Sequence, residues 1–104
     1  MNVAKLSNEP ERLPRLLPEY KVYRDAEKYT AEIRLPGVQK KDISLEVADR
    51  SFSLRALKED AEYFLCYLFA YEVNEAEAEA SYKDGLLKLV VPLKEKLEAS
   101  QGGS

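Results

Sequence analysis

The stretch "EIRLPGVQKKDISLEV", residues 32–47, decides the fold. A run of alternating apolar and polar residues lies on each side of a Pro-Gly pair and a charged turn, and such alternation is typical of half-buried β-strands. Pro36 fixes φ and removes a backbone donor, while Gly37 tolerates a sharp change of chain direction. We therefore predict that one strand ends here and that the chain crosses to a second sheet.

Length and composition indicate one globular domain. The chain has 104 residues, of which 45% are hydrophobic and 34% charged, and this balance is neither that of a disordered chain nor that of a membrane protein. Its longest apolar run, "YFLCYLFAY" at 63–71, is much shorter than the ~20 residues that span a bilayer. The start of the chain carries no pattern of a secretory signal, so we expect a cytoplasmic protein.

The same alternation recurs along the chain. "YKVYR" and "YTAEIRL" read as a hairpin that turns at 25–28, and "DISLEV" and "SFSLRAL" read as two further strands joined at Asp49-Arg50. We expect one face of each strand to point inward. The inward residues are Tyr29, Ala31, Ile33 and Leu35, then Ile43, Leu45 and Val47, then Phe52, Leu54 and Ala56.

The run at 62–73 is apolar on both faces, which favours a strand that is covered on both sides. Cys66 lies inside this run, cannot form an internal disulfide, and is expected to be a buried thiol. We predict a short helical turn at 74–77, a strand at 78–82, and a turn at "KDG". A last strand, "LLKLVV", would point Leu87, Leu89 and Val91 inward before Pro92 ends it.

About seven short strands with frequent turn signals predict an all-β fold, an antiparallel two-sheet β-sandwich of the immunoglobulin-like type. Residues 1–18 contain Pro10, Pro14 and Pro18, so we expect a flexible N-terminal arm there, and we expect its removal to leave the core folded. Residues 19–94 would form the domain, and residues 95–104 would form a disordered tail.

The inventory of reactive side chains argues against catalysis. The chain contains no histidine, so a Ser or Cys nucleophile would lack an imidazole base, and no His/Cys set could hold zinc. The glycines do not form a phosphate-binding loop, and the pair Glu59-Asp60 reads as a solvated turn. We expect no enzyme activity, no cofactor and no metal. The net charge of −3, without a clustered basic face, also argues against a nucleic-acid partner.

Two motifs resemble the α-crystallin domain of small heat-shock proteins. "YKVYRDAEKYTAEIRLPGVQKKDISLEV" is similar to the start of that domain, and Ala80, Asp84, Gly85 and Leu87 in "ASYKDGLL" match its Ala-x-x-x-Asn/Asp-Gly-x-Leu motif. The resemblance runs from about residue 18 to residue 94. It implies a sandwich of the α-crystallin/CS type, because the CS-type co-chaperones share this fold. We assign the motif residues a structural role and no chemistry: Leu35, Pro36, Gly37, Asp84, Gly85 and Leu87.

The resemblance also implies a hydrophobic groove between the strand after the Leu-Pro-Gly corner and the strand before the Asp-Gly turn. This groove would accept extended segments. We expect an ATP-independent holdase that binds unfolded or partly folded client proteins there; the alternative is a co-chaperone or adaptor that binds one folded ATP-driven chaperone. A purely structural role in the core remains open for the same residues. The expected groove residues are Ile43, Leu45, Val47, Ala78, Ala80 and Tyr82.

Two assembly devices of shell-forming small heat-shock proteins are missing from the pattern. The loop between the strands near Leu57 and Tyr63 is too short to hold an exchanged strand. The tail offers Leu93 and Leu97 rather than two apolar residues spaced by one. We therefore expect a monomer or small dimer.

Overall fold

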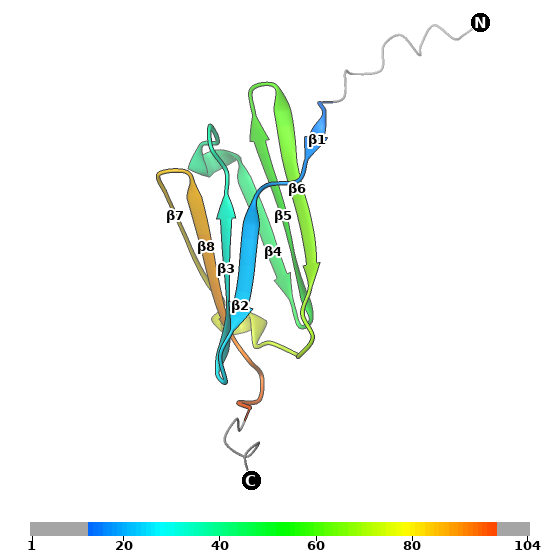
Figure 1. Ribbon diagram of the computed structural model, residues 1–104, viewed down its shortest axis with the longest axis vertical. Coiled ribbons are helices and arrows are strands. Elements are labelled where there is room, and N and C mark those ends of the chain that lie inside the picture. The colour runs from blue at the N-terminus through cyan, green and yellow to red at the C-terminus, as the bar shows by residue number, and fades with distance from the viewer. Residues whose placement is uncertain (1–12, 98–104) are drawn as a thin grey trace, which may run out of the picture.

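A computed structural model describes residues 13–97, and Figure 1 shows its two β-sheets facing each other. Within residues 13–97, each sheet has four strands. The first has the order β1-β6-β5-β4, with β1 Arg15–Leu16, β6 Ala61–Leu68, β5 Ser51–Lys58 and β4 Ile43–Ala48. The second has the order β2-β3-β8-β7, with β2 Tyr20–Arg24, β3 Lys28–Arg34, β8 Leu86–Pro92 and β7 Glu79–Lys83. The all-β sandwich predicted from the sequence is confirmed.

The crossing between the sheets occurs at the predicted corner. β3 belongs to one sheet and β4 to the other, and Gly37 between them has a φ of +83°, a conformation that glycine adopts at little cost. A 3-10 turn, η1 Lys40–Asp42, then leads into β4. A second 3-10 turn, η2 Glu75–Glu77, precedes β7 where the sequence predicted a helical turn. Figure 1 shows η1 and η2 at opposite ends of the sandwich.

The core lies between the sheets and is built mainly by the central strands. Strands β3, β5 and β8 each have a neighbour on both sides, so their inward side chains are sealed from water. The inward residues that the sequence predicted on these strands, and at the corner after β3, are all buried: Tyr29, Ala31, Ile33, Leu35, Phe52, Leu54, Ala56, Leu87, Leu89 and Val91. The inward residues of the edge strand β4 are only half-buried: Ile43, Leu45 and Val47.

The prediction of a strand covered on both faces at 62–73 is wrong. β6 buries Tyr63 and Leu65 against the core, whereas Cys66 and Leu68 point to solvent, Leu68 with 76% of its surface exposed. The sandwich has only two layers, so no further layer of described residues covers the outer face of β6: the guanidinium of Arg15 lies 4.4 Å from the centre of the Phe64 ring, and Cys66 and Leu68 stay exposed. The prediction that Cys66 is buried is therefore also wrong. The strand itself ends at Leu68, earlier than predicted.

The structure describes part of each predicted terminal segment. Within the arm, Arg15 and Leu16 pair in parallel with Glu62 and Tyr63 of β6, and within the tail, the N–H of Leu97 donates to the carbonyl of Ala26. The arm residues 1–12 and the tail residues 98–104 lie outside the described part. β5 and β6 are joined by a two-residue turn, 59–60, which is even shorter than the predicted loop. No helix within residues 13–97 has the length and apolarity needed to cross a membrane.

Candidate binding groove

The two sheets end on one side in β4 and β7, which have no strand partner on their outer side among the described residues. An edge strand presents unpaired N–H and C=O groups that another extended chain can bind. β4 and β7 also supply the walls of a shared hollow between the sheets. We call the space between these two edges the β4–β7 groove.

The hollow in the β4–β7 groove has a volume of about 190 Å³. Ile43 and Leu45 of β4 form one wall, and Ala80 and Tyr82 of β7 form the other. These are four of the six residues that the sequence predicted for the groove. The structure also adds residues to the lining that the sequence analysis did not place in the groove: Lys40, Ser81 and Leu87.

The other two predicted groove residues lie nearer to η2. Val47 is half-buried at the far end of β4 and does not line the hollow. Ala78 lines a separate hollow of about 390 Å³ together with Glu77, Glu79 and Val90. Glu79 and its partner Val90 lie on the opposite face of the sheet from Ala80 and Leu89, so this second hollow opens beside η2 on the outer face and is not part of the groove.

The small side chain of Ala80 leaves the groove open. Ala80 pairs with Leu89 of the buried β8, so its Cβ points into the space between the sheets, yet the residue remains exposed. Because residues directly opposite each other share a face of the sheet, Tyr82, which pairs with Leu87, points the same way. A partner side chain can enter beside Ala80 and contact Ile43 and Leu45 on the opposite wall.

Tyr82 anchors the groove wall to the corner after β3. Its hydroxyl lies 2.9 Å from the carbonyl oxygen of Leu35 and 2.7 Å from that of Val38, and its single proton can be donated to one of them at a time. Burial, and to a smaller extent the nearby hydroxyl of Tyr63, raises the pKa of Tyr82 above its ordinary value of 10.0. Tyr82 is therefore neutral and rigidly placed at physiological pH.

The opposite side of the sandwich, between β2 and β6, is closed by aromatic rings. Tyr67 of β6 packs edge-on against Tyr20 of β2 with ring centroids 6.2 Å apart, and it also contacts Phe52 and Phe69. Beyond these rings, the guanidinium of Arg24 lies 5.0 Å from the centre of the Tyr71 ring. Bulky rings fill one side and alanine leaves the other open, which explains why an apolar hollow forms beside β4 and β7.

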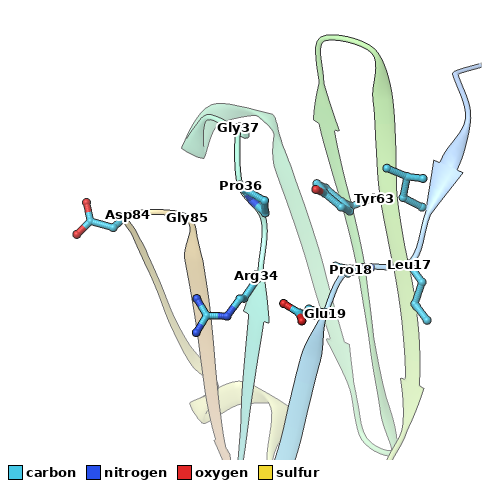
Figure 2. A pocket seen from close by; sticks show the side chains of 10 residues that line it. Leu17, Pro18, Glu19, Arg34, Pro36, Gly37, Tyr63, Asp84 and Gly85 are labelled. Atoms are coloured by element: carbon cyan, nitrogen blue, oxygen red, sulfur yellow. The ribbon is translucent and has the colours of Figure 1, made fainter.

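A larger hollow lies elsewhere, at the end where the chain crosses between the sheets, and has a volume of about 620 Å³. Figure 2 shows the Tyr63 ring reaching from β6 toward Pro36 there. The motif residues meet at this place, since the N–H of Leu35 donates to the carbonyl of Gly85 over 2.7 Å. Its charged residues, Glu19, Arg34 and Asp84, do not select one sign of ligand. We place the candidate site in the β4–β7 groove, because two free strand edges there flank a hollow whose walls are Ile43, Leu45, Ala80 and Tyr82.

No cluster of three or more metal-ligating side chains occurs within residues 13–97. The ion pairs of this region are surface contacts, such as that of Arg55 with Glu62 over 2.7 Å. The β4–β7 groove thus offers apolar surface, backbone hydrogen-bonding groups and the charge of Lys40. These suit the binding of an extended polypeptide.

Solved structures with the same fold include small heat-shock proteins. Heat shock protein 16.0 from Schizosaccharomyces pombe is 17% identical, with a TM-score of 0.73, over 80% of this chain and 92% of that chain. HSP18.5 from E. histolytica is 14% identical, with a TM-score of 0.70, over 77% of this chain and 90% of that chain. The hspA protein from Xanthomonas axonopodis is 11% identical, with a TM-score of 0.70, over 78% of this chain and 97% of that chain. At these identities the likeness shows the fold, which is that of the α-crystallin domain.

The model of the PIH1 CS-like domain family matches residues 17–94. The chain belongs to the PIH1 CS-like domain family. No match to this chain was found among curated proteins. The predicted resemblance to the α-crystallin domain is confirmed in the fold, and the family is of the CS type, which the sequence analysis gave as the alternative.

Proposed function

We propose that this protein is a chaperone-type binding domain that acts without ATP or catalysis and takes an extended segment of another polypeptide into the β4–β7 groove. The observation that carries the proposal is the pair of free strand edges beside an apolar hollow lined by Ile43, Leu45, Ala80 and Tyr82. Backbone groups at such an edge supply affinity, and the hollow supplies selection of alternate side chains.

Two kinds of partner fit this groove. A holdase for non-native chains needs exposed apolar surface, and some of it is provided by Leu16 of β1, by Leu17 directly after it and by Leu68 of β6. A co-chaperone or adaptor needs one defined site for one folded partner. Membership of the PIH1 CS-like domain family supports the second kind, and the exposed leucines support the first.

A substitution that fills the hollow tests the groove directly. Ala80→Arg places a long charged side chain where the partner's apolar side chain would enter. Ala48→Arg is the matched control, because Ala48 is an exposed alanine on the outward face of the edge strand β4. We expect Ala80→Arg to abolish partner binding and Ala48→Arg to retain it. Equal binding by both variants would place the binding surface outside the groove.

Two assays separate the kinds of partner. A holdase suppresses the light scattering of an aggregation-prone enzyme on heating, in proportion to the amount added. A co-chaperone instead retains one ATP-driven chaperone from a cell extract at both low and high temperature. Both assays are repeated with Ala80→Arg and Ala48→Arg. An activity that Ala80→Arg loses and Ala48→Arg keeps depends on the groove, whereas an activity that both variants keep does not.

A further inference from the structure

The free edge of β7 carries opposite charges at its two ends. Glu79, Ser81 and Lys83 alternate with the inward Ala80 and Tyr82, so they point to the outer face of the sheet. All five lie along the edge that faces no other described strand. A strand added at this edge would therefore meet a carboxylate at one end, a hydroxyl in the middle and an ammonium group at the other end.

Residues outside β7 strengthen the same polarity. Lys40 of η1 lines the hollow near Tyr82, and Glu77 of η2 lies beside Glu79 in the hollow at the opposite end. None of Lys40, Lys83, Glu77 and Glu79 takes part in an ion pair within residues 13–97. Asp84, in the turn after β7, is a nearby acidic residue (Figure 2), and the two positive charges of Lys40 and Lys83 exceed its single negative charge.

The direction of an added strand follows from the sheet that it would join. Every strand pair in the sheet β2-β3-β8-β7 is antiparallel, and antiparallel pairing is slightly more stable per residue than parallel pairing. An antiparallel segment would start beside Lys83 and end beside Glu79. Its second and fourth residues would lie opposite Tyr82 and Ala80 and would point into the hollow.

We propose that the β4–β7 groove selects an extended partner segment that reads, from its N-terminus, acidic, apolar, Ser or Thr, apolar, basic. The inference rests on the proposed function and names the partner chemistry of that same groove. The acidic residue would pair with Lys83 on the outer face, with Lys40 adding positive charge from the hollow, and the basic residue would pair with Glu79 and Glu77. The hydroxyl residue would lie opposite Ser81, and cross-strand Thr–Ser hydrogen bonds of this kind stabilise antiparallel pairs.

Three blocked peptides that share the core Val-Thr-Val test the proposal. They are Glu-Val-Thr-Val-Lys, the same residues with the charges exchanged to Lys-Val-Thr-Val-Glu, and the neutral Gln-Val-Thr-Val-Gln, each between Gly-Gly flanks and read by fluorescence anisotropy. We expect the first peptide to bind at least about threefold more tightly than the second at low salt, because two attractive pairs replace two repulsive ones. The difference should nearly vanish in 1 M salt, where charges are screened beyond ~3 Å.

Because Lys40 and Glu77 keep their charges, a double charge reversal of the protein at positions 79 and 83, Glu79→Lys with Lys83→Glu, should abolish or invert the preference between the two charged peptides. Both side chains are exposed, so this variant keeps the core intact. The inference is overturned if the wild-type protein binds the two charged peptides with equal affinity. It is also overturned if the double variant keeps the wild-type preference. Binding of the neutral peptide tests the proposed function separately. If no peptide binds, the proposed function of the groove fails. If all three peptides bind alike, only the proposed selection by charge fails.

Discussion

The hydroxyl of Tyr82 lies 2.7 Å from the carbonyl oxygen of Val38, and this contact joins a wall of the groove to the corner that carries the chain between the two sheets. The two residues are 44 positions apart in sequence. Because the same hydroxyl also reaches the carbonyl of Leu35, it spans the Pro36-Gly37 turn from one side to the other. The groove and the crossing are therefore one structural unit.

Tyr82→Phe is expected to lower the free energy of unfolding by about 1–2 kcal/mol, because partly buried carbonyls lose a hydrogen-bond donor while the ring stays in place. Urea denaturation followed by circular dichroism measures the change. Tyr71→Phe is the matched control, since Tyr71 is 42% exposed and its hydroxyl makes no hydrogen bond to another described residue. A loss no larger than that of the control would contradict the anchoring role of Tyr82.

Alkaline pH should weaken the same contact. The pKa of Tyr82 is raised by burial above the 10.0 of a free tyrosine, so the folded state favours the neutral, hydrogen-bonding form. The stabilisation of the folded state by neutral Tyr82 is fully present below pH ~10 and is lost as the pH rises through the pKa of Tyr82 in the folded state. The stability difference between the wild type and Tyr82→Phe should therefore shrink above pH ~10. A difference that is constant from pH 8 to 11 would rule out this linkage.

Leu89→Ala should destabilise the protein by about 2–5 kcal/mol, because it opens a cavity at an inward site of the central strand β8. Leu89 is 1% exposed and lies between the partners of β8 in β3 and β7. Leu68→Ala removes the same atoms from a residue that is 76% exposed and should change stability by less than about 0.5 kcal/mol. Similar losses for the two variants would show that the inward assignment is wrong.

Removal of residues 1–17 should leave the sandwich folded. β1 contributes only two residues to its sheet, and Leu16 and Leu17 are 41% and 68% exposed, so little apolar surface is lost with them. The pairing with β6, including the N–H of Glu62 donated to Pro14, accounts for an expected loss of about 1 kcal/mol. Thermal unfolding measures it. Failure of the truncated protein to fold would make the arm part of the core.

The protein should be a monomer or small dimer at tens of micromolar. β5 and β6 are joined by the two-residue turn 59–60, which leaves no residues for a strand exchanged with a partner. Size exclusion coupled to light scattering determines the mass directly. A particle of twelve or more subunits would mean that another segment, such as the arm at 1–18, drives assembly.

The sequence by itself determined the strands other than β1 and, except in β6, which of their faces points inward. Alternation placed Ile33, Phe52 and Leu89 in the core, and Pro36-Gly37 marked the crossing, because period-two patterning and the backbone limits of proline and glycine act within a few residues. The same period-two alternation also predicted that Ala80 and Tyr82 lie on one face of a strand and form one wall of the groove. The resemblance to the α-crystallin domain predicted the position of the groove from the sequence motifs alone.

Only the tertiary structure decided which apolar faces are covered and which charges share one edge. The run around Cys66 is apolar on both sides, yet one side faces solvent, since a two-layer sandwich covers a strand once and local sequence does not record the number of layers. Lys40 joined the groove only because η1 packs near Tyr82, 42 residues later in the chain. The physical reason is the same for both: burial and charge proximity depend on contacts between distant segments, which strand periodicity does not encode.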